Sequence, residues 1–426
     1  MALGTDIVKI SRMQRLIEDS IPPKVFSKRE AEYINSKKDK AQTAAGIFAA
    51  KEAVLKAMGL GIILPLNEVE ICHNQNGMPY VEFSEKAMDC FRGMGFKKTE
   101  ISISHDGEYA TASAYITPNE LFEFAEKIKA KFKIAPQNAI TPKDVCSLLP
   151  IRQSASHKGS YGRLYVLAGS KGLTGAAIMA CTSALRCGAG LISLGCAEEL
   201  NSIFEISMKE VMTKPLKSKN GLITKEDMSR IEKDIAASDV CLIGPGLGIS
   251  EDLKEIAASA IEHSTTPLVI DADGLNAIVN NTEVLNKCSQ SVVITPHIGE
   301  FARLTGYTAE EILSDTEKYA KEFSQKHNVH VILKSHKTVV ATPDGKCYVN
   351  ILGNPGMATG GSGDVLAGAV ASFLCQGNTP ENAAILGVYI HSLAADMAAA
   401  KLGEYSLTPS DIIDHISKAI LFTQNN

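Results

Sequence analysis

An aspartate near the end of the sequence follows a run of glycine and small hydroxyl residues. In the string NPGMATGGSGDVLAGAVASFL, Asp364 comes directly before an apolar stretch that predicts a helix. Backbone N–H groups at the start of a helix lack partners within the helix and suit a phosphate. We therefore predict an anion site with Asp364 beside it as a base, already ionised at pH 7 at its ordinary pKa. The alternative is an aspartate that only caps the helix.

A second group of charged residues lies near the beginning of the sequence. Glu52 and Lys56 are four residues apart in AAGIFAAKEAVLKAMGLG, so on a helix they share one face, with Lys51 beside them. Asp6, in the apolar segment GTDIVKI, needs a cation to offset the loss of water around its carboxylate. Asp6 and Glu52 together predict a Mg²⁺ site, because magnesium commonly binds one or two carboxylates plus substrate phosphates. For Glu52 and Lys56 alone, a surface salt bridge is the alternative.

Acids and an imidazole follow two apolar stretches of the second half. Asp271 and Asp273, in VIDADGLNAI, suit metal or ribose contacts, or alternatively a turn and a helix cap. His297, in TPHIGE, is either a satisfied histidine at a strand end or a ligand contact. Glu300 follows on the same loop, where a carboxylate can organise Mg²⁺. These residues add acidic and imidazole groups to the predicted anion site.

Such residues require elements that bring them together. From about Asn138 the sequence alternates helical stretches with apolar strands, in RLYVLAGS, DVCLIGPGLG, PLVIDADGLNAI, QSVVITPHIGE and VHVILKS. Near-continuous apolar strands predict a buried, mainly parallel sheet with helices on both faces, an α/β domain. Because ligands of such sheets bind beyond the carboxyl ends of the strands, we expect the Gly, Asp, His and Lys residues there to form one site.

The first part of the sequence predicts an α+β domain instead. Its expected features are a strand over 3–10, a helix over 40–58, and turns at Asn76-Gly77 and Asp106-Gly107. Pro118 then opens a charged amphipathic helix, NELFEFAEKIKAKF, which ends before Pro136. We therefore divide the chain into an α+β domain at 1–117, a helical linker at 118–137 and an α/β domain at 138–426.

The composition excludes several classes of protein. With 426 residues, 45% of them hydrophobic, the chain is long enough for two cores, and its net charge of −5 argues against non-specific nucleic-acid binding. Its ten cysteines show no C-x-x-C pair or zinc spacing and, without a signal peptide, indicate a reducing cytoplasm. No apolar run is expected to span a membrane, since the candidate at 176–196 contains Arg186.

The first domain resembles the holo-acyl-carrier-protein synthases, which are 4′-phosphopantetheinyl transferases. The resemblance rests on GTDIVKISRM, FSKREAEYI, FAAKEAVLKAMGLG, NQNGMPYV and ISISHDGEYATA, which occur in the family's order. It implies transfer of phosphopantetheine from coenzyme A to a serine of apo acyl carrier protein, with Asp6 and Glu52 binding the Mg²⁺ on the pyrophosphate. It also implies that coenzyme A contacts Lys51, Lys56 and His105.

Two residues of this domain bear on its partner and its phosphate contacts. Arg12 resembles the arginine with which the family meets the acidic carrier protein. Ile47 is a departure, because many relatives carry arginine in this segment. We therefore expect one phosphate or carrier contact to be absent. A non-catalytic domain that binds carrier protein is the alternative function, and the retained acids and lysines argue against it.

The second domain resembles the ADP- or ATP-dependent NAD(P)HX dehydratases of the ribokinase-like superfamily. The resemblance rests on HKGSYGRLYVLAGS, GLTGAAIMACTSALRCGAGL, GPGLG, VIDADGLNAI, TPHIGEFARLTG, VILKSHKTVV and NPGMATGGSGDVLAG. It implies that NADHX or NADPHX, the hydrated forms of NADH and NADPH, is phosphorylated on its added hydroxyl and loses phosphate. The implied substrate contacts are Ala176, Gly246, His297 and Asp364. The implied nucleotide contacts are Lys334, Ser335, His336, Lys337, Thr338 and Gly363.

Other features leave alternatives open. A vitamin or sugar kinase of the same superfamily would use the same anion site and base, so it is the alternative function of the second domain. Ser335 stands where relatives commonly have glycine and is expected to tighten the adenine pocket. His157-Lys158-Gly159 is expected either to support phosphate binding or to cap the sheet. Relatives of both domains self-associate, so we expect a homo-oligomer, with no nucleic-acid or membrane partner.

Overall fold

The computed structural model describes residues 2–60, 64–118 and 120–425 and divides into two compact units, Met1–Lys131 and Phe132–Asn426. Helix α5 (Glu120–Phe132) lies within the segment predicted as a helical linker, of which Asn119 lies outside the described residues. The domain boundaries at 118 and 138 stay predictions. Gly61, the last residue of the motif that contains Glu52, also lies outside the described residues.

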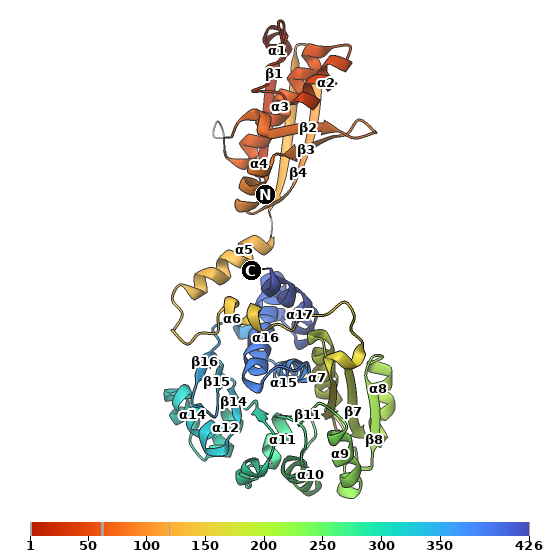
Figure 1. Cartoon of the computed structure of the whole chain (residues 1–426), viewed down its shortest axis with the longest axis vertical. Helices are drawn as coiled ribbons and strands as arrows, with labels where there is room; N and C mark the ends of the chain where they lie inside the picture. The colour runs from red at the N-terminus through yellow and green to blue at the C-terminus, as the bar shows by residue number, and fades with distance from the viewer. Residues whose placement is uncertain (1, 61–63, 119, 426) are drawn as a thin grey trace. The chain divides into compact units, whose positions relative to one another are not determined.

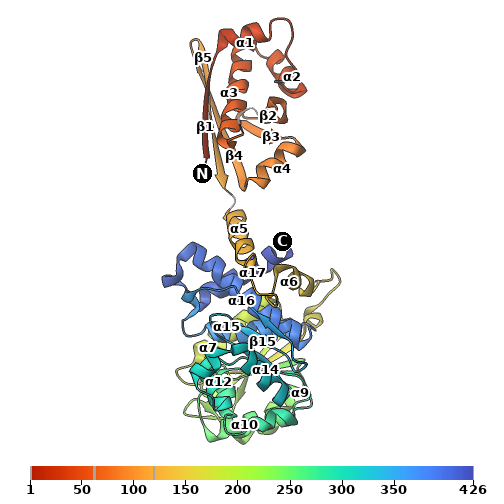
Figure 2. The ribbon, with the colours of Figure 1, turned by 90° about the vertical axis from the view of Figure 1, so that its left-hand side faces the viewer.

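A three-stranded antiparallel sheet and one long helix form the core of the first unit. The strand order is β1-β5-β4, and α3 packs against one face of this sheet (Figure 2). The α+β prediction is confirmed. The elements are β1 (Ala2–Lys9), α1 (Ile10–Leu16), α2 (Lys28–Ser36), α3 (Lys40–Met58), β2 (Val69–His73), β3 (Pro79–Phe83), α4 (Glu85–Gly93), β4 (Phe96–Asp106) and β5 (Tyr109–Pro118).

Strand β1 lies unusually close to α3. A Cβ atom added at Gly4 would lie 2.0 Å from the carbonyl oxygen of Ala53 and 2.5 Å from the backbone nitrogen of Ala57, so only glycine fits there. Helix α3 begins after Asp39, whose carboxylate accepts from the Gln42 N–H, and ends at Gly59 in the left-handed conformation. This close approach places Asp6, two residues after Gly4, beside the helix.

A nine-stranded sheet forms the centre of the second unit, in the order β16-β15-β14-β13-β12-β11-β6-β7-β8. The seven strands from β14 to β8 are parallel, whereas β15 and β16 form an antiparallel hairpin at one edge. The predicted mainly parallel sheet is confirmed. The strands are β6 (Arg163–Leu167), β7 (Leu191–Ala197), β8 (Met212–Leu216), β11 (Val240–Ile243), β12 (Leu268–Ile270), β13 (Val292–Ile294), β14 (His330–Leu333), β15 (Val339–Ala341) and β16 (Cys347–Val349).

Helices α7, α15, α16 and α17 pack on one another, and Figure 1 shows them together within the unit. Helix α15 also contacts β6, β11 and β12, so it joins this group to the sheet. The helices are α6 (Pro142–Leu148), α7 (Thr174–Cys187), α8 (Asn201–Ser207), α9 (Met228–Ala236), α10 (Glu251–Glu262), α11 (Ala272–Ala277), α12 (Ile298–Thr305), α13 (Ala309–Ser314), α14 (Thr316–His327), α15 (Ser362–Cys375), α16 (Pro380–Leu402) and α17 (Pro409–Gln424).

The expectation that no apolar run reaches membrane-spanning length is wrong for α16. Its 23 residues are long and apolar enough to cross a membrane by length and composition alone, but 89% of its most apolar window is buried inside the protein. This burial is that of a core helix, because its neighbours α15 and α17 cover it. All ten cysteines are free, as their spacing predicts, and six of them are buried.

Candidate functional site

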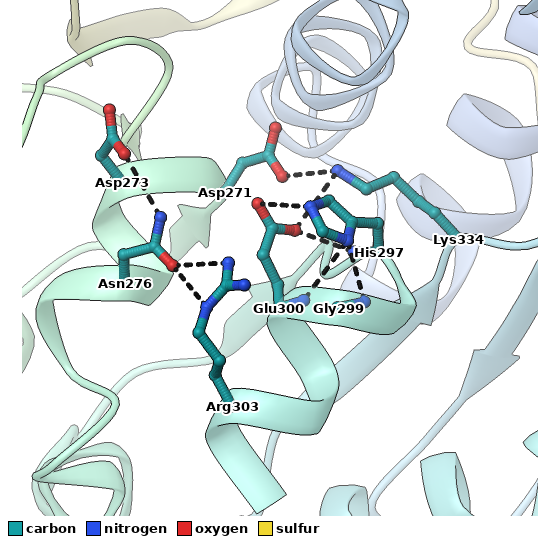
Figure 3. Close-up of polar contacts among 8 residues, drawn as sticks. All are labelled: Asp271, Asp273, Asn276, His297, Gly299, Glu300, Arg303 and Lys334. Atoms are coloured by element: carbon teal, nitrogen blue, oxygen red, sulfur yellow. Dashed lines mark hydrogen bonds and ion pairs between the residues drawn. The ribbon is translucent and has the colours of Figure 1, made fainter. Parts of the chain in front are cut away.

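The carboxyl ends of three neighbouring strands supply most of the charged groups of the second unit. Asp271 follows β12 directly, His297 lies three residues after β13, and Lys334 follows β14 directly. These strands are adjacent and parallel, so their ends lie at one edge of the sheet. The prediction that polar residues gather at this edge is confirmed, because side chains far apart in the sequence meet there (Figure 3).

Lys334 is the centre of this cluster. Its Nζ lies 2.8 Å from Asp271 Oδ1 and 4.0 Å from Glu300 Oε2, and both carboxylates are almost fully buried. Burial alone lowers the pKa of Lys334, but the charges of Asp271 and Glu300 outweigh it and raise that pKa above its usual range. One ammonium therefore faces at least two carboxylates, and the cluster keeps a surplus of negative charge.

Asp364 joins the cluster from the start of α15. It is the third residue of this helix, and a Cβ atom on the preceding Gly363 would lie 3.1 Å from Lys334 Nζ. Burial, followed by the charge of Asp271, raises the pKa of Asp364 to about 7, although Lys334 opposes the shift. The expectation of an ordinary pKa is therefore wrong, because the nearby carboxylates and the loss of water both disfavour the ionised form. Such a group gains and loses its proton near neutral pH.

Asp273, in the first turn of α11, connects this helix with the loop after β11. Its Oδ2 accepts from the Gly248 N–H at 2.8 Å, and its Oδ1 accepts from Asn276 Nδ2 at 3.3 Å. The Asn276 Oδ1 in turn accepts from Arg303 at 2.9 and 3.2 Å (Figure 3). Asn276 and Arg303 were not singled out from the sequence. Asn276 lies within VIDADGLNAI, but the partnership with Arg303, 27 residues away, has no sequence signal.

His297 caps the start of α12. Its Nδ1 accepts from the Gly299 N–H at 2.9 Å and from the Glu300 N–H at 3.3 Å, while Glu300 Oε2 accepts from the His297 N–H at 2.8 Å. The side chain is nevertheless 54% exposed. Its other ring nitrogen, Nε2, lies 3.5 Å from Glu300 Oε1, so both ring nitrogens have neighbours within the first turn of α12. The predicted ligand contact of His297 stays a prediction.

The segment 334–338 forms a tight loop between β14 and β15. Ser335 Oγ donates to the Lys337 carbonyl at 2.7 Å and accepts from the Lys337 N–H at 3.3 Å, and Thr338 Oγ1 donates to the Ser335 carbonyl at 3.5 Å. His336 and Lys337 are exposed. The serine in place of glycine thus closes the turn with its own hydroxyl. The predicted effect on an adenine pocket stays a prediction.

The remaining predicted residues of the second unit divide into two places. Ala176 and Gly246 lie together, because a Cβ atom on Gly246 would be 2.9 Å from Ala176 Cβ. His157 lies elsewhere, in the 3₁₀ turn before β6, where its Nδ1 accepts from the Gly159 N–H at 3.1 Å. This turn precedes the amino end of β6, whereas Asp271 and Lys334 follow carboxyl ends. The structure therefore favours the capping alternative for His157.

In the first unit, β1 and α3 bring Asp6 and Lys56 together. Lys56 Nζ lies 2.7 Å from Asp6 Oδ1 and donates to the Thr5 carbonyl at 3.2 Å. Glu52 lies one turn before Lys56 on α3 and is half-buried. Asp6 on β1 and Glu52 on α3 are thus carboxylates on two elements in contact, and the Lys56 ammonium lies beside Asp6, as the sequence predicts. This donor set fits Mg²⁺ with phosphate, because a metal needs the acids and a phosphate needs the lysine.

His105 lies apart from this pair. His105 pairs with Ala110 near the end of β4, and β5 separates β4 from β1, which is a distance of about 10 Å across two strand spacings. Arg12 lies on α1 with its guanidinium 5.9 Å from the ring of Phe48. Ile47 is 1% exposed and belongs to the core, so the residue at this position does not face a phosphate.

Lys51 makes a buried ion pair in place of the predicted contact with coenzyme A. Its Nζ lies 2.6 Å from Glu30 Oε2 and donates to the Leu66 carbonyl at 3.0 Å, and neither charged side chain is more than 1% exposed. Burial lowers the pKa of Lys51, although Glu30 opposes the shift. Glu30 also accepts from the backbone N–H groups of Ser27 and Ile71. The pair therefore joins α2, α3 and β2.

Replacing Lys51 by methionine is expected to destabilise the first unit by about 3–5 kcal/mol, because Glu30 would remain buried without its cation. Differential scanning calorimetry of the full chain should show a lower unfolding temperature for the first unit and an unchanged one for the second. The double variant Glu30→Gln/Lys51→Met is the control, and it should recover much of the stability because no charge is then left unpaired. A single variant as stable as the wild type would contradict a structural role for Lys51.

Comparison with known proteins assigns both parts of the chain. Residues 164–418 match the family model of NAD(P)H-hydrate dehydratase, and residues 2–118 match that of the 4′-phosphopantetheinyl transferase superfamily. The bifunctional NAD(P)H-hydrate repair enzyme Nnr of Moorella thermoacetica is 39% identical over 271 residues, which cover 63% of this chain and 51% of that protein. The chain thus spans about half the length of this relative.

A curated protein and a solved structure, both from Bacillus subtilis, match nearly over their whole length. The ADP-dependent (S)-NAD(P)H-hydrate dehydratase is 32% identical over 277 residues, 64% of this chain and 94% of that protein. The crystal structure of an ADP/ATP-dependent NAD(P)H-hydrate dehydratase, co-crystallised with ATP and Mg²⁺, has a TM-score of 0.58 and 29% identity and covers 67% of this chain. The chain therefore belongs to the NAD(P)H-hydrate dehydratase family, and it carries in residues 2–118 a member of the 4′-phosphopantetheinyl transferase superfamily.

Proposed function

We propose that the second unit dehydrates NADHX and NADPHX to NADH and NADPH with ADP or ATP as the phosphate donor. The observation that carries this proposal is the position of Asp364, a base with a pKa of about 7 at the start of α15, beside the Lys334–Asp271 pair. A base for a hydroxyl proton and N–H groups for a phosphate meet there. Family membership supports the choice of substrate.

In the proposed reaction, Asp364 takes the proton of the added ring hydroxyl as this oxygen bonds to the terminal phosphorus of the nucleotide. The bond between that phosphorus and the bridging oxygen of the nucleotide breaks. The ring carbon–oxygen bond then breaks, phosphate leaves with the electron pair, and loss of a ring proton restores the nicotinamide. The N–H groups at the start of α15 and the Lys334 ammonium stabilise the negative charge on the transferred phosphoryl group.

Magnesium fits the acidic cluster. Asp271 and Glu300 exceed the single charge of Lys334, and carboxylates that face phosphates are the usual magnesium ligands. These two residues would hold the ion, which supplies neutralisation of phosphate charge when it is bound. The same residues also keep Lys334 protonated, because their charges raise its pKa.

Product analysis tests the proposal against the kinase alternative. The full chain is incubated with hydrated NADPH and with ADP or ATP, and the products are separated by chromatography. We expect NADPH and free phosphate. A stable phosphorylated dinucleotide, or transfer only to a vitamin or sugar hydroxyl, would favour the kinase.

The pH dependence of kcat/KM should report Asp364. Because the carboxyl of Asp364 must be ionised to accept a proton, kcat/KM is expected to fall about tenfold per pH unit below pH 7 and to level off above it. Initial rates at low substrate concentration between pH 5 and pH 9 measure this fall in kcat/KM. A profile that stays flat down to pH 5 would contradict a base with a raised pKa.

For the first unit we propose transfer of phosphopantetheine from coenzyme A to a serine of apo acyl carrier protein. The observation in its favour is the Asp6–Lys56 pair with Glu52 one helical turn away. Asp6 and Glu52 would hold Mg²⁺, which stabilises the leaving diphosphate, and Lys56 would neutralise a phosphate. His105 is proposed to meet coenzyme A, and Arg12 the carrier protein. Incubation with coenzyme A, Mg²⁺ and apo carrier protein tests this, since binding without transfer would indicate a scaffold.

An exposed apolar face of the first unit and the free cysteines bear on the assembly and location of the chain. The face of the sheet opposite α3 exposes Leu3 and Ile7 by 69% and 63%, a surface suited to contact with a second copy of the chain. A homo-oligomer and a cytoplasmic location are thus consistent with the apolar face and the ten free cysteines.

A further inference from the structure

We propose that Asp396, on α16, is a positioning residue for the glycine-rich loop that precedes Asp364. This inference rests on the proposed dehydratase function, because that function gives the loop its phosphate. Asp396 accepts hydrogen bonds from Gly353 and Asn354, which lie about ten residues before Asp364 in the sequence. It acts on the first residues of the loop, and the loop transmits its position to the start of α15.

Asp396 holds the loop with both carboxylate oxygens. Its Oδ2 accepts from the Gly353 N–H at 3.2 Å and its Oδ1 accepts from Asn354 Nδ2 at 2.9 Å, and the residue is only 8% exposed. Asn354 uses its other side-chain atom as well, because its Oδ1 accepts from the Gly356 N–H at 3.1 Å. The orientation of the Asn354 amide is therefore determined on both sides.

A second residue of α16 holds the chain just before the loop. Ser392, four residues before Asp396, accepts from Asn350 Nδ2 at 3.0 Å, and the same nitrogen donates to the Leu352 carbonyl at 2.9 Å. Residues four apart on a helix lie on the same face. One face of a buried helix thus anchors the loop at two successive turns.

Local backbone hydrogen bonds carry this anchor to the catalytic end of the loop. The N–H of Met357 donates to Asn354, that of Ala358 to Pro355, that of Thr359 to Met357 and that of Ser362 to Thr359, at 2.8–3.4 Å. Because each bond overlaps or adjoins the next, these bonds connect the backbone of Asn354 with that of Ser362. A shift at Asn354 is therefore passed to Ser362, two residues before Asp364.

An exchange of the two side chains tests the proposal. In Asp396→Asn, the new amide nitrogen faces either Asn354 Nδ2 or the Gly353 N–H, so one of the two hydrogen bonds is lost in either orientation. In Asn354→Asp, two carboxylates face each other. The double variant Asn354→Asp/Asp396→Asn can form all three hydrogen bonds again: donor and acceptor are exchanged between the two side chains, and the Gly353 and Gly356 N–H groups still donate to side-chain oxygens. We expect each single variant to lower kcat/KM for the nucleotide about 10- to 100-fold, with a higher KM, because a loop displaced by about 1 Å misplaces the phosphate. The double variant should return to within about threefold of the wild type.

The controls separate positioning from stability and from the proposed reaction. Asp414→Asn, an exposed acid on α17, should change neither rate nor affinity. If the single variants melt at lower temperature but keep wild-type KM and kcat while folded, or if the double variant is no better than the singles, Asp396 has no positioning role. Nucleotide affinity is also measured directly by calorimetry with ADP and with ATP. If the wild type shows no turnover, the proposed reaction is wrong. The nucleotide affinities of the wild type, the single variants and the double variant would still decide the role of Asp396.

Discussion

Asp364→Asn is expected to lower kcat of the dehydration about 10²- to 10⁴-fold while leaving nucleotide affinity unchanged. The substitution keeps the size of the side chain and removes its ability to accept a proton, which is the usual contribution of a general base. Lys334, Asp271 and the N–H groups of α15 stay in place, so the phosphate site remains. Single-turnover rates and calorimetric titration with ADP and ATP measure the two properties on the same sample.

Stability should not explain this loss. The raised pKa of Asp364 means that its ionised form is disfavoured in the folded protein. The stability that the protonated group provides is fully present below the unfolded pKa, near 4, and is lost as pH rises through about 7. Asp364→Asn should therefore melt no lower than the wild type at pH 8. Turnover at the wild-type rate would remove Asp364 from the mechanism.

Asp6→Ala is expected to lower the rate of transfer from coenzyme A about 100- to 1,000-fold and to leave the dehydration rate unchanged. Removal of one preorganised charged group at a reacting centre costs about 100- to 1,000-fold in rate, and Lys56 would also lose its partner 2.7 Å away. The two activities should separate because the chain forms two compact units with their own cores. Both reactions are assayed on one preparation of the full chain.

Glu18→Ala is the matched control for Asp6→Ala. Glu18 is an exposed acid of the same unit, so its loss should affect neither reaction. A simultaneous fall of both activities in Asp6→Ala would show that the units are not independent. Unchanged transfer in that variant would place the metal elsewhere.

The sheet edge that carries the second site could be predicted from the sequence. In the sequence, an apolar strand is followed at its carboxyl end by Asp, His or Lys, and the carboxyl ends of parallel strands lie at one edge of the sheet. Asp271, His297 and Lys334 followed this pattern, although 63 residues separate the first from the last. The glycine and hydroxyl residues before Asp364 likewise preceded a helix start, where α15 begins.

The properties that depend on side-chain surroundings could not be predicted. The pKa of Asp364 depends on burial and on Asp271, a residue distant in the sequence. Lys51 and Glu52 are neighbours in one motif, yet successive helix positions point about 100° apart, so one side chain meets Glu30 in the core while the other remains half-exposed. The role of Asp396 depends on contacts with Gly353 and Asn354 that no local pattern encodes.

One measurement tests the nucleotide-dependent dehydration most directly. Hydrated NADH is added to the full chain with and without ADP or ATP, and the return of the near-ultraviolet absorbance of NADH is recorded together with free phosphate. The account predicts that absorbance returns only with nucleotide, with one phosphate released per NADH formed. Absorbance that returns equally without nucleotide, or phosphate released without any NADH, would contradict it.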